Sequence, residues 1–541
     1  MRKIGWLFGA ALFFAAGAPA MAQDEATQIR QEVEDFLKPL AETGAAGEEA
    51  VLSHGTIGVA AAGSAYVVTV PDLQWAPDAT GHFEIGTVSF SLTPEGDDLY
   101  HVGDVKIPAE IPHKTAAGSV DGSISLPSQQ FIAVWSRSRE TFIQLDASLR
   151  DIKIVSAPDS MALSAGEVVA KITGTDRGNG RWDQDYTGHV VGLSVTVPEG
   201  SYSLGSMDES FGVRGFNLKG WAAVRDRVEA MTKAMEANPS ASAAAPASAS
   251  QPDPKLMEAL RGATPLFASS NANITVSAVS FHDSTGKEVF SLPTGTLTLG
   301  AEGFDQAIGR IALSLTHAGL VVNDIAPTEQ DTLPREVALN VALENLPVQE
   351  LWKGAIDTLS SADLSTDQGS SMAMMMFIGL LQQSLVNGKA RINVTDSHLA
   401  LALARAQLSG IIEASADSMF GVGKMTVDVT GLDALIAAVT AHGGPQSEEL
   451  SELQVIRGFS NRQTAAGGAV TDHYDLDFTP QGQFLVNGKE FSFMGSGAAE
   501  TPPDGSMAPD ASAPPPSDGT TGDTTTPPPA DGSSGDTTSS N

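Results

Sequence analysis

The feature that most constrains this chain is the alternation of apolar and polar side chains in many short runs. Successive side chains of a β-strand point to opposite faces, so each run gives a strand one apolar face. The clearest runs are Val191, Leu193, Val195, Val197; Ile311, Leu313, Leu315; Val337, Leu339, Val341, Leu343; Leu399, Leu401, Leu403; and Tyr474, Leu476, Phe478. Turn sequences such as PEG, NGK and PQGQ separate the runs. This pattern favours antiparallel hairpins over parallel crossovers.

Three segments change abruptly from strand alternation to helical spacing, at Leu218, Leu346 and Leu432. The apolar residues that show the change are Phe211, Val213, Trp221, Val224, Val228, Met231; Leu339, Val341, Val348, Leu351, Trp352, Leu359; and Met425, Val427, Leu435, Ile436, Val439. The candidate caps and first-turn residues are Asn217, Asn345, Asp433 and Pro347. We expect each helix to fold back over apolar sheet surface. Internal duplication and chance similarity both account for the likeness among the three segments.

Two further helices follow from apolar residues on one face. The first carries Ile29, Val33, Phe36, Leu37 and Leu40, and the second carries Met374, Phe377, Ile378, Leu381 and Leu385. Together these patterns predict an α+β fold in two halves. Each half contains a long, curved antiparallel β-sheet covered on one face by amphipathic helices.

Low-complexity stretches divide the chain. Residues 1–22 have the basic start, apolar run and small residues of a secretory signal peptide. Residues 238–254 have the composition of a flexible linker, and residues 495–541 form an acidic tail rich in Pro, Thr, Ser and Gly that we expect to be disordered. The sequence therefore predicts an amino-terminal α+β part at 23–237 and a carboxy-terminal α+β part at 255–494.

Charge and cysteine content limit the compartment and the partners. The chain has 65 acidic residues against 31 basic ones, a net charge of -34, and no cysteine. Such a charge opposes binding of nucleic acid, and the absence of cysteine excludes disulfides and an acylated amino terminus. After the signal, no segment approaches 20 consecutive apolar residues. We expect a periplasmic protein with no integral membrane segment after signal cleavage.

The sequence contains no recognisable catalytic or cofactor motif. The ten histidines never form a metal-binding pair at short spacing, and neither a GxSxG elbow nor a glycine-rich phosphate loop is present. Asp176, Asp183 and Asp185 lie in a glycine-rich segment from Gly174 to His189, but their spacing does not fit an EF-hand. A long hairpin explains this segment more simply than a calcium site does. We therefore expect no cofactor, no metal and no enzymatic activity.

The methionine-rich helix is the candidate ligand-binding element. Four methionines lie within residues 372–376, and their flexible thioether side chains suit an adaptable apolar surface. Met374, Phe377, Ile378 and Leu381 are the candidate ligand-binding residues, as a lid over a lipid. The alternative is that they are ordinary core residues.

The chain resembles a family of exported bacterial proteins of unknown function that is loosely similar to AsmA-type envelope proteins. The segments behind the resemblance are GSISLPSQQFIAVWS with LDASLRDIKIV, ALENLPVQELW, GVGKMTVDVTGLDALIAAV and YDLDFTPQGQFLVNGKEFSF. The resemblance implies a periplasmic protein with long curved sheets and a hydrophobic groove. It implies no activity, and a cleavable signal in place of a membrane anchor departs from the AsmA type.

Three functions remain open at this point. The leading hypothesis is a non-enzymatic periplasmic protein that binds lipid or another envelope component in a groove between sheet and helices. The first alternative is an envelope scaffold or interaction protein without a ligand. The second is a hydrolase whose site is assembled from distant residues.

Overall fold

A computed structural model of the chain describes residues 25–41, 51–78, 80–96, 98–139, 141–157, 160–237, 253–361, 367–418, 421–444, 447–464, 468 and 470–491. The predicted signal peptide, most of the predicted linker and the predicted tail lie outside the described residues.

The chain is dominated by β-strands, many of them long. The strands are β1 (Val51–Ser53), β2 (Gly58–Ala62), β3 (Ala65–Asp78), β4 (Gly81–Glu95), β5 (Leu99–Lys106), β6 (Glu110–Thr115), β7 (Val120–Ser125), β8 (Ser128–Ser136), β9 (Thr141–Ser156), β10 (Met161–Gly178), β11 (Arg181–Val197), β12 (Gly200–Asn217), β13 (Ser269–Asp283), β14 (Glu288–Glu302), β15 (Gly309–Ala318), β16 (Val321–Val322), β17 (Glu336–Leu346), β18 (Arg391–Ala400), β19 (Arg405–Glu413), β20 (Val422–Thr430), β21 (Asn461–Thr464), β22 (Val470–Phe478), β23 (Phe484–Val486) and β24 (Lys489–Glu490).

Within the described residues these strands form one 24-stranded sheet whose pairings are antiparallel. From β9 to β15 each strand pairs with the next in the sequence, and the order continues through β17, β18, β19 and β20 to β22. Between β4 and β9 two short routes run side by side, one through β5 and β8 and the other through β6 and β7. The predicted antiparallel α+β class is confirmed.

The sheet does not stop at the predicted boundary between two parts. β12 lies before the predicted linker and β13 after it, and these two strands pair from Gly200↔Asp283 to Arg214↔Ser269. The described residues from Glu25 to Phe491 belong to one compact unit. The structure therefore differs from the prediction of a separate sheet on each side of residues 238–254, because strands on both sides extend the same hydrogen-bonded ladder.

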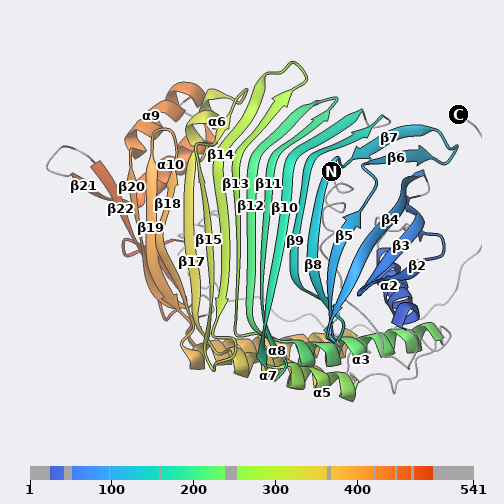
Figure 1. The fold of residues 1–541 in the computed structure, drawn as a ribbon. Coiled ribbons are helices and arrows are strands. Elements are labelled where there is room, and N and C mark those ends of the chain that lie inside the picture. Colours follow the sequence, from blue (N-terminus) through green and yellow to red (C-terminus); the bar gives the residue numbers. More distant parts are fainter. Residues whose placement is uncertain are drawn as a thin grey trace, which may run out of the picture. The chain divides into compact units, whose positions relative to one another are not determined.

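The helices are α2 (Glu25–Ala41), α3 (Leu218–Ala237), α5 (Pro254–Ala263), α6 (Pro327–Thr332), α7 (Val348–Ser361), α8 (Asp367–Gly388), α9 (Leu432–Gly443) and α10 (Glu448–Phe459). α3 and α5 connect β12 to β13, and α7 and α8 connect β17 to β18. These four helices lie along one end of the strands, while α6, α9 and α10 lie at the opposite end (Figure 1).

The three predicted strand-to-helix junctions are confirmed, but the expected folding of these helices over the sheet face is not, because α3, α7 and α9 lie at the ends of the strands (Figure 1). β12 passes directly into α3, and one residue separates β17 from α7 and β20 from α9. Asn217 caps α3, because its Oδ1 accepts a hydrogen bond from the Gly220 N–H at 2.9 Å. Asp433 lies inside α9 and pairs with arginines, so the predicted cap at this position is wrong. The N-cap is Gly431 at a φ of 80°, a conformation that favours glycine.

Candidate functional site: an apolar face of the sheet

The strand register assigns each side chain to one face, because opposite residues of an antiparallel pair point to the same side. One row of opposite residues crosses the sheet from β2 to β23 and consists of apolar residues, tyrosine and glycine. The row is Ala61, Tyr66, Leu92, Val102, Ala133, Leu145, Ile172, Tyr186, Phe211, Ala272, Leu299, Leu313, Val341, Val394, Gly410, Met425, Leu476 and Val486. We call the side that carries this row the apolar face.

The rows on either side of it are also mainly apolar, with Glu209 and Ser270 as polar members. The next row, two residues away on each strand, is Phe131, Ala147, Ala170, Gly188, Glu209, Ile274, Leu297, Leu315 and Leu339. Toward the helices α3, α7 and α8, the row is Val213, Ser270, Ala301, Ile311, Leu343, Ile392 and Ile412. The apolar face is therefore at least three rows of side chains wide.

The opposite face of the same strands is polar. One row on it is Asp146, Lys171, Thr187, Ser210, Asn273, Thr298, Ser314 and Asn340. These side chains bond across strands: Thr298 Oγ1 donates to Asn273 Oδ1 at 2.8 Å, and Ser314 Oγ donates to Asn340 Oδ1 at 2.7 Å. The alternation in the sequence thus separates a face that water can hydrate from one that it cannot.

Helix α2 covers the apolar face near its first strands. Ile29 is 1% exposed and packs in a core with Val68 and other residues of β3 and β5, with Val33 and Leu37 partly buried beside it. Glu25 accepts hydrogen bonds at 2.9 Å from the hydroxyls of two tyrosines on that face. The prediction of an amphipathic amino-terminal helix is confirmed, and here a helix does pack across the sheet.

From β12 to β15 several large side chains of the same face are exposed, although Val213 on β12 and Val394 on β18 are only 8% and 6% exposed. Phe211 is 46% exposed, Leu299 45%, Ile274 39% and Leu315 39%. β13, β14 and β15 contribute no apolar side chain to the buried core. We call the part of the apolar face on β12 to β18 the open face.

Three titratable groups lie among these apolar side chains: Tyr186, Glu209 and His317. The Glu209 carboxylate accepts a hydrogen bond from the Tyr186 hydroxyl, with 3.5 Å between the oxygens. Burial is the larger cause that raises the pKa of Tyr186, and the nearby Glu209 carboxylate raises it further. His317 lies opposite Gly295 and Val337, and its Nδ1 atom is buried without a hydrogen-bond partner.

The residues predicted to bind a ligand all lie on α8, at one end of the strands. Met374 and Ile378 are 60% and 54% exposed, whereas Phe377 and Leu381 are half-buried. α8 packs on α7, where a Cβ atom at Gly354 would lie 2.5 Å from a methyl carbon of Leu380. The structure brings the four residues together on one helix. The exposed side chains of the open face lie on other elements, the strands β12 to β15 and β18.

The aspartates considered for calcium are each paired with an arginine. The distances are 2.6 Å for Asp176 with Arg139, 2.7 Å for Asp183 with Arg177 and 2.6 Å for Asp185 with Arg214. In the described parts of the chain no group of three His, Cys, Asp or Glu residues could hold a metal ion. The segment from Gly174 to His189 forms the β10–β11 hairpin, as the alternative interpretation predicted.

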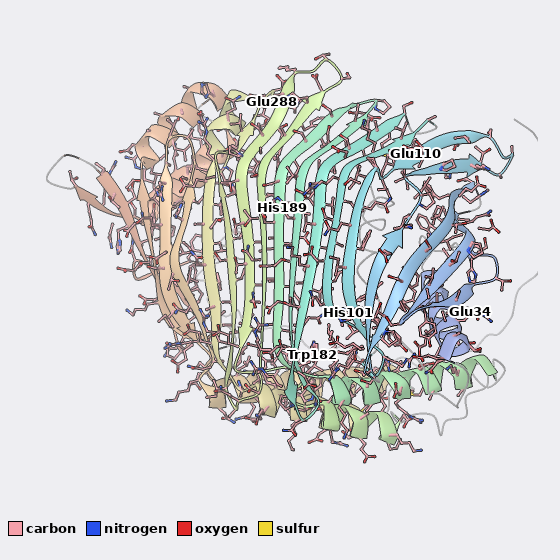
Figure 2. The ribbon with its side chains drawn as sticks, in the orientation of Figure 1. Glu34, His101, Glu110, Trp182, His189 and Glu288 are labelled. Carbon is pink, nitrogen blue, oxygen red and sulfur yellow. The ribbon has the colours of Figure 1, made fainter. Side chains whose placement is uncertain are left out.

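A shallow depression of about 340 Å³ lies by β10 to β13, lined by Lys171, His189, Asp208, Ser210 and neighbours. His189 lies midway along the long strands (Figure 2), and its Nδ1 atom is 2.6 Å from Asp208 Oδ1. Among the contacts of the described residues, no hydrogen bond joins this ring to Ser210.

Among the described helices, Gln368–Gly388 of α8 is long and apolar enough to cross a membrane by length and composition. No protein-family model matches the chain, and no curated protein matches it either. The assignment of a function therefore depends on the geometry of this chain alone.

Sequence reasoning found the strands of the open face but missed the face itself. The alternation at Ile311, Leu313 and Leu315 predicts one side of a strand, and so does the alternation from Val337 to Leu343. A single strand does not reveal its neighbours, so the continuous row became visible only with the register. The signal present in the sequence was the repetition of such runs without enough helices to cover them all.

Proposed function

We propose that the open face binds the acyl chains of a lipid, and that the protein is a non-enzymatic lipid-binding protein of the periplasm. The observation that carries this proposal is the contrast along one face. At β3 the face is buried under α2, whereas Phe211, Ile274 and Leu299 further along are more than a third exposed.

The dimensions of the open face support this class of ligand. Five inter-strand steps separate β12 from β18, which corresponds to roughly 24 Å at the usual strand spacing. Three rows spaced two residues apart give a width of about 14 Å. One leaflet of a bilayer contributes about half of a hydrocarbon core of ~30 Å. An extended acyl chain therefore fits along the open face.

The hydrogen bonding of the strands also favours a hydrocarbon ligand over an added strand. β13, β14 and β15 are paired along both edges, so their backbone groups already have partners. Binding to the open face therefore gains its free energy from apolar contact, at about 25 cal/mol per Å² removed from water. An acyl chain provides such contact without polar groups that need partners.

The periplasmic location and the resemblance to AsmA-type envelope proteins belong to this proposal. A lipid carrier between two membranes must keep acyl chains from water, and an apolar face on an otherwise acidic, well-hydrated chain does this. The rival function is a scaffold whose open face is covered by another protein. It predicts a bound protein and no bound lipid.

The test is native mass spectrometry of the protein purified gently from a Gram-negative host. We expect adducts with the masses of host lipids on the wild type. The double variant Leu299→Gln with Leu315→Gln should lose at least nine-tenths of the adduct. The matched control is Thr298→Gln with Ser314→Gln, which places the same side chain on the same strands but on the polar face.

The control should keep its lipid, although it removes two cross-strand hydrogen bonds. A wild type without lipid adducts would contradict the proposal. Equal loss of lipid in both double variants would mean that lipid binding depends on sheet integrity and not on the open face.

A further inference from the structure

α8 is largely apolar from Met372 to Leu381 and yet poorly covered. Only 11% of its most apolar window is buried, and no charged residue occurs between Gln368 and Gly388. A helix that is apolar on all sides is expected either in a protein core or in a membrane. α8 therefore lacks the surroundings that its composition requires.

The exposed side of α8 is wide. The exposed fractions are 52% for Met372, 60% for Met374, 65% for Met375, 54% for Met376 and 54% for Ile378. With 3.6 residues per turn, these positions cover an arc of roughly 200°. The remaining arc carries Ala373 and Ser384, which are buried against the rest of the protein. Over residues 372–378, more than half of the helix circumference thus offers thioether and aliphatic groups to the surroundings.

The neighbouring helices extend this surface. α3, α5, α7 and α8 lie along the same end of the strands (Figure 1). α7 exposes 39% of Trp352 and 41% of Leu359, and α3 exposes 47% each of Trp221 and Val228. Tryptophan combines an apolar ring with one polar N–H, a combination that suits the boundary between lipid and water.

The charges of these helices distinguish them from the rest of the chain. The chain has a net charge of -34, but α3, α5, α7 and α8 together carry equal numbers of basic and acidic residues. These four helices, which we call the helical end, therefore form a neutral surface on a strongly acidic molecule. The helical end is the part that a lipid headgroup layer repels least.

We propose that the helical end docks on a lipid bilayer, with the exposed arc of α8 inserted among the headgroups and upper acyl chains. A fluid bilayer surrounds a helix over a wide arc, which a rigid protein surface does not do, and flexible methionines adapt to it. α7 follows β17 and α8 precedes β18, and these strands carry Leu343 and Ile392 of the open face at that end.

Docking would thus place the edge of the open face at the bilayer surface, where an acyl chain passes from one apolar surface to the next. This transfer step rests on the proposed function. Docking itself rests only on the helices, so the two proposals fail separately.

The test is flotation of the mature full-length protein with phosphatidylcholine vesicles. Met374→Gln, Met375→Gln and Ile378→Gln combined should reduce the vesicle-bound fraction at least tenfold. The control is Val455→Gln with Ile456→Gln on α10, at the opposite end of the strands, where the side chains are 52% and 47% exposed. This control should bind vesicles like the wild type, and both variants should keep the wild-type melting temperature.

Absence of vesicle binding by the wild type, or equal loss in both variants, would overturn the docking proposal. So would a wild-type dimer that becomes monomeric in the α8 variant without any vesicle binding, because a second copy would then occupy the surface. The Leu299→Gln, Leu315→Gln variant should dock normally, which separates docking from lipid binding by the open face.

Discussion

Truncating a side chain at the contact between α2 and the apolar face should cost much more than truncating an exposed side chain of the open face. Ile29 is 1% exposed and packs against Val68 and Val70, so Ile29→Ala should cost about 2 to 5 kcal/mol of unfolding free energy. Leu299 is 45% exposed. Full burial of a leucine is worth about 1.5 to 3 kcal/mol, so Leu299→Ala should cost about 1 kcal/mol. The expected difference is about 2 kcal/mol.

The assay is urea unfolding of delipidated protein, followed by intrinsic tryptophan fluorescence. Trp135 lies beside the core that contains Ile29 and reports its loss. Adding lipid should stabilise the wild type more than Leu299→Ala, because a ligand stabilises only the state that binds it. Equal costs for the two truncations in lipid-free protein would refute the reasoning, since a costly Leu299→Ala requires a covered face.

Three further predictions concern local structure. Gly431→Ala should destabilise the protein by about 1 to 3 kcal/mol, because the φ of Gly431 is 80° and a Cβ atom there would lie 2.0 Å from a carbonyl oxygen. Gly458 lies in open space on α10, so Gly458→Ala should stabilise the protein by about 0.5 to 1 kcal/mol. Thermal melts that reverse this order would contradict the fold at these positions. The hydrogen bond to Asp428 raises the pKa of His473 above 6.5, so its stabilisation is complete below that pH and is lost as pH rises through the raised value. Melting temperatures at pH 6 and 8 should therefore differ less in His473→Gln than in the wild type, and an unchanged difference would exclude this residue as the cause. Calcium should leave the melting temperature unchanged, because arginines neutralise the aspartates of residues 174–189, and a clear rise on adding calcium would contradict this assignment.

The sequence predicted local structure well wherever one segment determines its own conformation. The junctions at Leu218, Leu346 and Leu432 appear because alternation gives way to helical spacing within a few residues. The NGK turn before the last strand is a two-residue hairpin in which Asn487 and Gly488 have φ values of 51° and 75°. Asparagine and glycine tolerate positive φ, so the sequence alone predicts this turn.

Long-range features could not be predicted in this way. The pairing of β12 with β13 depends on two strands separated by helices and a low-complexity stretch, and nothing local encodes their register. The exposure of Met374 and Ile378 depends on what packs around α8, whereas the pattern alone fits a core helix equally well. Sequence alternation indicates that one face of a strand is apolar. Only the tertiary structure shows whether that face is covered.

Photocrosslinking locates a bound lipid on the chain and therefore tests the central claim most directly. The mature protein would be loaded with a diazirine-bearing fatty acid, irradiated and digested, and the modified residues identified by mass spectrometry. The account predicts crosslinks to the apolar face of β12 to β15, at residues such as Phe211, Ile274, Leu299 and Leu315. Crosslinks on the polar face, at Thr298 or Ser314, or crosslinks confined to α8, would contradict it.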